Sequence, residues 1–538
     1  MLPEFLLCTG IASGCILSAR ILLHYFQLES YQFPGYFRTI RRNVLKSFSP
    51  GFILMILNII VLFLILQVCP EKVSPWIVCP IGLVILTGAG FFIGRAFSEK
   101  KAKKAFVFTP RIKRLYAASF ILISLILFAA FYTSRHSLVF RFPLSVFIFA
   151  FPVFLPFWIA LSGLIAWPIE KLISEMYFRD AQRKLRERPD LIKIGITGSW
   201  GKTSVKFILG TLLEEKYHTL VTPASYNTPM GVTKVIRTKL EPGHRIFVSE
   251  MGARHVGDIK EMCRLVHPHI GILTSVGPQH LDTFKKLENV IKTKYELIDA
   301  LPEDGEAFFS DDEGICRDLY NKTTLSRHLS GLNRDICDVW AEDISYSPDG
   351  SSFVLCTHDQ RVSCSTMLLG ELNIRNILLC SSVALHLGLS LDQICRGIRK
   401  IHPVEHRLQL IRHPGGPNVI DDAFNSNIIG AKQAFHVLKS FPPNRIIVTP
   451  GMVELGDKEY DMNYEFGCAM SDCCDTAILV GKKRSEAISA GLCDNGFPKN
   501  AIHIVSSLDE ASSLLRIIAR PGDTILFEND LPDHYSET

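Results

Sequence analysis

A glycine-rich turn between an apolar run and a helical pattern is the strongest chemical signal in the sequence. The turn reads Gly195-Ile-Thr-Gly198-Ser-Trp-Gly201-Lys202-Thr203-Ser204 and follows the apolar run 191–196. Strand, glycine-rich turn and helix together form a phosphate cradle, because backbone N–H groups and the positive helix end bind oxyanions. Lys202 would neutralise phosphate charge, and Thr203 can reach Mg²⁺. We therefore predict a nucleotide-phosphate site made of Gly198, Ser199, Gly201, Lys202, Thr203 and Ser204.

The turn is a variant of the usual nucleotide-binding pattern. That pattern requires a glycine five positions before the Gly-Lys pair, and this chain has Ile196 there. The turn therefore reads Thr-Gly-x-x-Gly-Lys-Thr.

Two further polar residues follow predicted strands. The run 245–252 reads as a buried strand that carries Glu250 near its end, and the run 269–274 leads into a loop with His280. Ligands of α/β sheets bind at the carboxyl ends of strands. We therefore expect Glu250 and His280 beside the cradle, where they would complete a metal–phosphate site.

The elements that position these residues are predicted from periodicity. Helical spacing follows the cradle to about Tyr217, the loop Asn227-Thr-Pro-Met-Gly231 leads into a helical run to Leu240, and 374–401 is helical in period. Alternation over 352–369 indicates a β-hairpin region. After Pro403 strands and helices alternate again, which predicts a doubly wound sheet. Its strands are 418–421, 445–449, 476–480, 501–505 and 523–527, with a helix over 509–519.

The first 170 residues have the composition of a membrane domain. Five charge-free windows stand there, and the last four each reach the roughly 20 residues that cross a bilayer. The first window is short and is followed by Arg20 and His24, and the last carries four prolines. We predict about five spans, at 5–19, 51–70, 73–94, 115–134 and 142–169.

Loop charges predict the orientation of these spans. Basic residues are concentrated in alternate loops, at 38–46, 100–114 and 171–188, whereas the other loops carry only Lys72, Arg135 and Arg141. By the positive-inside rule the N-terminus lies outside, and everything after residue 170 is cytoplasmic. The basic stretch 176–188 is interpreted either as a juxtamembrane helix that touches anionic headgroups or as a solvated linker.

Composition excludes some other classes of protein. The net charge of +5 is modest and arises near the apolar segments, and no arginine-rich run interleaved with aromatic residues appears, so we expect no nucleic-acid binding. The fifteen cysteines show no Cys-x-x-Cys pair and no His/Cys cluster at zinc spacing, which favours reduced thiols in the cytosol.

Several spaced motifs together resemble the Mur ligase family, most closely its MurF branch, which adds D-alanyl-D-alanine to a UDP-linked muramoyl tripeptide. The similarity covers about residue 190 to the C-terminus. The motifs are the cradle, Asn227-Thr-Pro-Met-Gly, Ser249-Glu-Met-Gly-Ala, His280 followed by Lys294-Tyr-Glu, Gly370-Glu-Leu-Asn-Ile-Arg-Asn376, His406-Arg-Leu, and Ile420-Asp-Asp-Ala-Phe-Asn-Ser-Asn427.

The resemblance implies a fold and a reaction. The fold would be an N-terminal α-helical transmembrane domain (1–170), a basic linker (171–190), a P-loop-type central ATP-binding α/β domain (191–402) and a Rossmann-like C-terminal α/β domain (403–538). The reaction would be ATP-dependent: a carboxylate attacks the γ-phosphate to give an acyl phosphate, which an amine converts to an amide. Catalysis would be mainly positioning and charge neutralisation.

Individual roles also follow from the resemblance. Lys202, Glu250, His280 and Lys294 would be catalytic. Thr203, Glu250, His280 and Lys294 would hold two Mg²⁺ ions, with Lys294 carbamylated. The resemblance implies nucleotide contacts for Asn376, Arg407 and Asp422, and substrate contacts for Asn227, Asn425 and Asn427.

The chain also departs from the family pattern, which leaves alternatives open. Leu372 and Ile428 stand where relatives often have histidine and proline, and membrane spans replace the UDP-sugar-binding domain. The substrate could therefore be lipid-linked or polymeric instead of UDP-linked. Other hypotheses are a membrane-bound poly-γ-glutamate-type ligase, a folylpolyglutamate synthase-like enzyme, a nucleotide-binding membrane scaffold without ligase activity, and an ATP-driven transporter.

Overall fold

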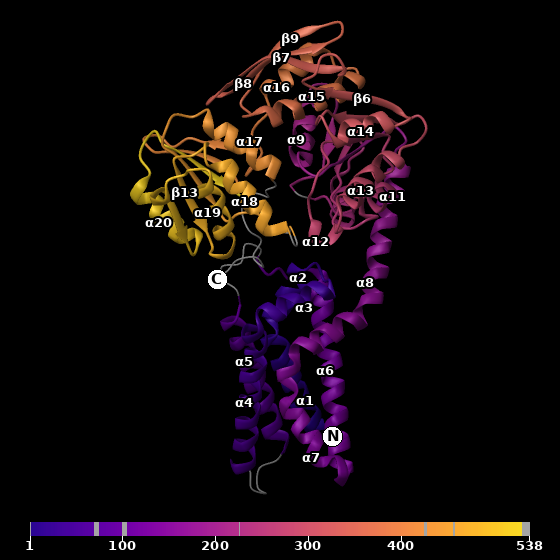
Figure 1. Ribbon diagram of the computed structural model, residues 1–538. Coiled ribbons are helices and arrows are strands. Elements are labelled where there is room, and N and C mark those ends of the chain that lie inside the picture. The colour runs from indigo at the N-terminus through magenta and orange to yellow at the C-terminus, as the bar shows by residue number, and fades with distance from the viewer. Residues whose placement is uncertain are drawn as a thin grey trace. The chain divides into compact units, whose positions relative to one another are not determined.

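The computed structural model describes residues 2–68, 75–98, 105–224, 226–423, 428–453, 455 and 458–529. The chain forms two compact units, Met1–Glu175 and Met176–Thr538. The first unit is helical and the second contains both β-sheets, as the indigo-to-magenta and the magenta-to-yellow parts of Figure 1 show.

The first unit is a bundle of apolar helices. α1 packs against α5 and α6, α4 against α5, and α6 against α7. The apolar core of the bundle includes Leu54 of α4, Leu86 of α5 and Leu127 of α6, and some polar side chains of the unit, such as Asn58 and Glu170, are buried as well. Its helices are α1 (Leu2–Ser18), α2 (Arg20–Leu28), α3 (Phe33–Arg42), α4 (Val44–Val68), α5 (Pro75–Ala96), α6 (Pro110–His136), α7 (Leu138–Ala150), the 3₁₀ turn η1 (Phe151–Phe154) and α8 (Leu155–Arg186).

Within the described residues, four helical segments are long and apolar enough to cross a membrane. A fifth would be the pair α1 and α2, which is bent by 47° at Ala19. All five correspond to the predicted windows. The four segments are Val44–Val61, Cys79–Ala96, Pro110–His136 and Phe142–Arg186.

The first α/β sheet has nine strands in the order β2-β3-β1-β4-β5-β6-β7-β8-β9. The strands from β2 to β7 are parallel, and β7, β8 and β9 form an antiparallel meander. The bounds are β1 (Ile192–Thr197), β2 (Thr219–Val221), β3 (Ile246–Glu250), β4 (Ile270–Leu273), β5 (Glu306–Ser310), β6 (Ser326–Gly331), β7 (Val339–Ser347), β8 (Gly350–Thr357) and β9 (Arg361–Thr366).

Helices cover both faces of this sheet because side chains alternate along each strand. On β3, Ile246 and Val248 join the core beneath α9 (Lys202–Leu213) and α15 (Glu371–His386), whereas Phe247 faces the other core. That second core includes residues of α10 (Pro229–Lys239), α11 (Asp258–Val266) and α13 (Leu287–Asp299). The remaining helices of this region are α12 (Leu281–Phe284), α14 (Ile315–Lys322) and α16 (Leu391–Arg399).

The second sheet has six strands in the order β10-β11-β15-β12-β13-β14, and only β10 is antiparallel. Its five parallel strands are the five predicted ones. The strands are β10 (Gln409–Ile411), β11 (Asn418–Asp422), β12 (Arg445–Thr449), β13 (Thr476–Val480), β14 (Ile502–Val505) and β15 (Thr524–Glu528). The helices are α17 (Ile428–Lys439), α18 (Glu459–Met470), α19 (Lys483–Asp494), the turn η3 (Lys499–Ala501) and α20 (Leu508–Ile518).

The predicted helical period over 374–401 is confirmed, and it is divided between two helices. These are α15 and α16, which are separate because Gly388 adopts a left-handed φ of 77° and Ser390 caps α16 with a capping box to Gln393. The predicted hairpin over 352–369 is confirmed as β8 and β9.

The basic stretch after the apolar helices continues α8 as far as Arg186, and it is not a free linker. Phe178, Ala181 and Leu185 of α8 are buried in the core that contains α10 and α11. Asp180 pairs with Arg237 of α10 at 2.7 Å. The last turns of α8 are therefore packed on the first α/β sheet.

Candidate nucleotide and metal site

The phosphate loop connects β1 to α9. Gly198 and Gly201 adopt φ values of 155° and 82°, and Gly201 is the N-cap residue of α9. A Cβ atom on Gly198 would come within 2.1 Å of the Thr274 hydroxyl, so only glycine fits there. Among the described residues no side chain caps α9 at Gly201, and the N–H groups of its first turn are suited to an anionic ligand.

The loop that follows β4 holds this turn in place. The Ser199 N–H donates to the Ser275 carbonyl at 2.8 Å, and the Trp200 N–H donates to the Ser275 hydroxyl at 2.8 Å. The Ser199 hydroxyl donates to the Gly277 carbonyl at 3.0 Å. These bonds connect two loops at the carboxyl ends of adjacent parallel strands, β1 and β4.

Lys202 lies across its own loop. Its ammonium group donates to the carbonyls of Gly198 and Ser199 at 2.7 and 2.9 Å. Burial lowers the pKa of Lys202 to about 8, Glu250 opposes this change, and Arg407 adds to it. The ammonium group is therefore close enough to interact electrostatically with a carboxylate and with a second cation.

Glu250 is the centre of the hydrogen-bond network. It ends β3 and is 1% exposed. Its Oε1 atom accepts from the Thr203 hydroxyl at 3.2 Å and from Asn227 Nδ2 at 3.0 Å. The structure thus brings together three residues that the sequence assigned to one site.

A third side-chain partner of the Glu250 carboxylate was not predicted. Lys206 Nζ lies 3.0 Å from Glu250 Oε2, is fully buried, and also donates to the Ala224 carbonyl. Burial lowers the pKa of Lys206, and Glu250 opposes that change. The sequence signal was a lysine one helical turn after Lys202, within an otherwise apolar stretch of α9.

Lys294 lies buried on α13 and is 2% exposed. Burial lowers its pKa well below the ordinary value, and the charge of Lys202 adds to this effect, whereas nearby carboxylates oppose it. Glu296, two residues later, instead caps α11 by accepting from the N–H groups of Gly257 and Lys260 at 2.9 Å. Of these two motif residues, Lys294 interacts with the phosphate-loop lysine and Glu296 is structural.

His280 and Asn376 lie on other elements, and Asn376 lies close to the phosphate loop. His280 ends the loop after β4, where it is the left-handed N-cap of α12 with a φ of 51°. Asn376 of α15 is 3% exposed, and a Cβ atom on Gly201 would lie 3.1 Å from its Oδ1 atom. The amide of Asn376 therefore faces the start of α9.

The beginning of the C-terminal region contributes a second charged pair. Arg407 and Asp422 interact electrostatically, and Asp422 Oδ1 accepts from the Leu408 N–H at 3.1 Å. Burial raises the pKa of Asp422 to about 6 although Arg407 opposes the change. Burial also lowers the pKa of Arg407, whose charge reaches Glu250. Asn425 and Asn427 lie outside the described residues.

The donor atoms around Glu250 suit Mg²⁺. The Glu250 carboxylate and the Thr203 hydroxyl offer hard oxygen ligands, which this ion prefers. Lys206 already balances the charge on Oε2, so Oε1 is the oxygen directed to Thr203 and Asn227. The residues present fit a nucleotide-bound Mg²⁺.

Comparison with known proteins decides the family. The Mur ligase middle domain profile matches residues 196–384, and the Mur ligase, glutamate ligase domain profile matches residues 406–528. UDP-N-acetylmuramoyl-tripeptide–D-alanyl-D-alanine ligase of Mycobacterium tuberculosis is 30% identical over 356 residues, which are 62% of this chain and 69% of the relative. The chain belongs to the Mur ligase family.

Other Mur ligases extend this similarity. The ligase of the same name from Escherichia coli K12 is 29% identical over 321 residues, or 59% of this chain and 70% of the relative. MurF from Acinetobacter baumannii has the same fold, with a TM-score of 0.61 at 23% identity, covering 68% of this chain and 79% of that structure.

A MurF ligase from Thermotoga maritima, solved in complex with ADP, gives a TM-score of 0.59 at 24% identity over 68% of this chain and 82% of its own. The family fold therefore lies in the second unit. In this Mur ligase, apolar helices replace the usual UDP-binding domain. The chain is an ADP-forming acid–amino-acid ligase that uses ATP and Mg²⁺.

Proposed function

We propose that this Mur ligase joins D-alanyl-D-alanine, or another amine, to the carboxylate of a cell-wall precursor at the cytoplasmic face of a membrane. The relatives that are named for adding D-alanyl-D-alanine support the reaction. The observation that carries the proposal is the buried carboxylate of Glu250, held by Thr203, Asn227 and Lys206 beside the phosphate loop.

The reaction proceeds through an acyl phosphate. A substrate carboxylate oxygen attacks the γ-phosphorus of ATP and ADP leaves. The amine then attacks the acyl carbon, and the resulting tetrahedral intermediate releases phosphate and a proton to give the amide. Lys202 exchanges its two loop carbonyls for β- and γ-phosphate oxygens, where its positive charge balances the charge that develops on ADP.

Mg²⁺ supplies charge neutralisation and alignment of the phosphate oxygens when it is bound. Thr203 and Glu250 would hold one ion, and His280 with Lys294 would hold a second. Lys294 is suited to carbamylation because its low pKa favours the neutral amine, which is the form that adds CO₂. The carbamate would provide oxygen ligands for the ion, which the protonated amine of Lys294 cannot do.

The remaining residues position the nucleotide and the substrates. Asn376 faces the start of α9 and would contact adenine, Arg407 the phosphates and Asp422 the ribose. Asn227 has its side chain beside Glu250 and would orient the substrate. Asn425 and Asn427 would face the nucleotide or the acceptor.

We propose that residues 1–170 span the membrane about five times with the N-terminus outside, and that the domains at 191–402 and 403–538 are cytoplasmic, joined to the membrane by 171–190. The apolar helices and the basic loops between them support this topology. Without a UDP-binding domain, a lipid-linked or polymeric carboxylate substrate held at the bilayer is the simplest substitute for a soluble one.

The proposal is tested by ADP release from the full chain in detergent, across a matrix of carboxylate precursors and amines. We expect ADP formation to require both a muramoyl-peptide carboxylate and D-alanyl-D-alanine or a similar amine. The Lys202→Ala variant should lose about 10³-fold in turnover. ADP release that is independent of any amine, or full cellular function of Lys202→Ala, would instead support a scaffold role.

A further inference from the structure

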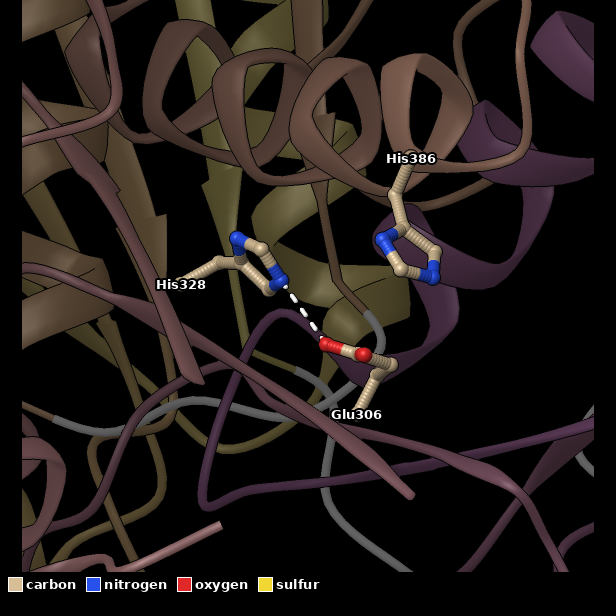
Figure 2. Close-up of side chains that lie close together, drawn as sticks. All are labelled: Glu306, His328 and His386. Atoms are coloured by element: carbon tan, nitrogen blue, oxygen red, sulfur yellow. Dashed lines mark hydrogen bonds and ion pairs between the residues drawn. The ribbon is translucent and has the colours of Figure 1, made fainter. Parts of the chain in front are cut away.

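A cluster of one carboxylate and two imidazoles lies outside the nucleotide site. Glu306 begins β5, His328 lies on β6, and His386 ends α15, so the three come from positions far apart in the sequence. Figure 2 shows their side chains converging from three elements. One ligand atom from each lies within 4.8 Å of the other two.

The sheet register explains why these side chains meet. β5 and β6 are parallel neighbours in which Phe308 is paired with His328 and Glu306 with Ser326. Phe308 stacks on the His328 ring with centroids 4.5 Å apart and an interplanar angle of 17°. α15 packs on the same two strands, and the Phe308 ring also contacts His386, edge-on at 5.6 Å. The aromatic ring therefore holds both imidazoles beside the carboxylate.

We propose that Glu306, His328 and His386 bind a divalent transition-metal ion, with Zn²⁺ as the best match. Two imidazoles and one carboxylate, with a water in the fourth position, are a frequent tetrahedral ligand set for this ion. Bond lengths of about 2.1 Å place tetrahedral donor atoms about 3.4 Å apart. Glu306 Oε2 and His328 Nε2 are 2.9 Å apart, so these two ligands need only small adjustments, and the exposed His386 ring can move in from the helix end.

The surroundings also match a metal site. Asp338 Oδ2 lies 4.0 Å from His328 Nδ1, on the opposite side of the ring from Glu306. Imidazoles that bind metals usually direct their other nitrogen to a carboxylate or carbonyl, which fixes the ring.

An ion bound by these three residues would connect strands β5 and β6 to the last turn of α15. In the first turns of this helix, Asn376 faces the start of α9, and the adjacent Arg375 donates to the Asp311 carbonyl at 2.6 Å. His386 is in its last turn. A bound ion would fix the end of α15 that the nucleotide site does not hold. This role is structural and independent of the proposed ligase reaction.

Zn²⁺ binding to the chelator-stripped full chain in detergent tests the proposal. We expect one high-affinity Zn²⁺ per chain by competition with a chromophoric chelator, and a rise in Tm of several degrees at saturation. His386→Ala should weaken binding at least tenfold, and because this side chain is exposed its loss should leave the fold intact. Glu306→Gln should weaken binding similarly.

His436→Ala is the matched control, because this exposed histidine lies on α17 of the other sheet. It should bind Zn²⁺ like the wild type. X-ray absorption of the bound ion should show a shell of nitrogen and oxygen with two imidazoles. Unchanged affinity in His386→Ala, a shell that contains sulfur from the chain's thiols, or no binding at micromolar Zn²⁺ would each overturn the proposal.

Discussion

The ammonium group of Lys206 lies 3.0 Å from Oε2 of Glu250, and neither side chain is more than 1% exposed. The two residues come from the first helix after the phosphate loop and from the end of the neighbouring strand β3. Lys206 leaves the other carboxylate oxygen, Oε1, to Thr203 and Asn227. The pair thus sets both the charge and the orientation of the carboxylate that we assign to Mg²⁺.

Replacement of Lys206 should therefore damage both stability and catalysis. Lys206→Met leaves Glu250 buried without its cation, which typically costs about 3–5 kcal/mol in the free energy of unfolding. ATP turnover should fall at least about 100-fold, because Glu250 either becomes protonated or moves. Chemical denaturation and ADP release measure the two effects.

A double variant separates the two effects. Lys206→Met with Glu250→Gln removes both charges, so most of the lost stability should return while activity stays low. Lys239→Met, an exposed lysine at the end of α10, is the control and should leave both quantities near the wild-type values. If Lys206→Met were as stable and active as this control, the pair would have no role in the site.

Features that depend on neighbouring residues in the sequence could be predicted, whereas contacts between distant elements could not. The phosphate loop and the strands that end near Glu250 and His280 follow from local patterns, and the sheet rule then brings their carboxyl ends together. The pairing of Lys206 with Glu250 depends on how α9 docks against β3, which periodicity does not encode. The ion-pair partner of a charged residue on a buried helix face is therefore known only from the fold.

The cluster of Glu306, His328 and His386 shows the same limit more strongly. These residues are spread over 81 positions, and none has the short spacing of a familiar metal motif. Their proximity arises from the strand order β5-β6 and from the packing of α15 on both strands. The break between α15 and α16, by contrast, has a local cause, since Gly388 adopts a left-handed conformation and Ser390 caps the second helix.

The pH dependence of kcat/KM for ATP should be bell-shaped. Ionised Asp422 accepts a hydrogen bond from ribose more strongly than the protonated acid does, and burial raises its pKa to about 6, so activity should fall as pH falls through 6. Lys202 must be protonated, and burial lowers its pKa to about 8, so activity should be lost as pH rises through 8. Asp422→Asn should lower activity and remove the acidic limb. An acidic limb that persists in Asp422→Asn would assign it to another group.

Turnover should depend on dissolved CO₂ if Lys294 is carbamylated. Burial and the charge of Lys202 lower the pKa of the Lys294 amine well below the ordinary value, which favours the neutral form. Carbamylation forms an N–C bond to CO₂ and releases one proton, so degassed, bicarbonate-free buffer should reduce kcat at least about tenfold and added bicarbonate should restore it. The protein labelled with ¹³C-bicarbonate should show a carbamate resonance that Lys294→Arg lacks. Full activity without CO₂, together with no such resonance, would leave Lys294 as a plain buried cation.

Reporter fusions should show the orientation of the helices. Alkaline phosphatase fused after His136, between α6 and α7, should be active because this loop is predicted to lie outside. A fluorescent protein fused after Thr538 should be fluorescent because the C-terminus is predicted to be cytoplasmic. The reversed pattern would place the nucleotide site away from ATP and contradict the topology.

Competition between lipid-linked and UDP-linked muramoyl peptides is the most direct test of a ligase that acts at a membrane. The full chain in lipid vesicles would be given both carboxylate substrates at equal concentration with ATP, Mg²⁺ and radiolabelled D-alanyl-D-alanine, and the labelled products separated by extraction. We predict that label enters the lipid-linked product at a higher kcat/KM, with one ADP released per amide formed. Equal or faster labelling of the soluble UDP-linked peptide would contradict the account.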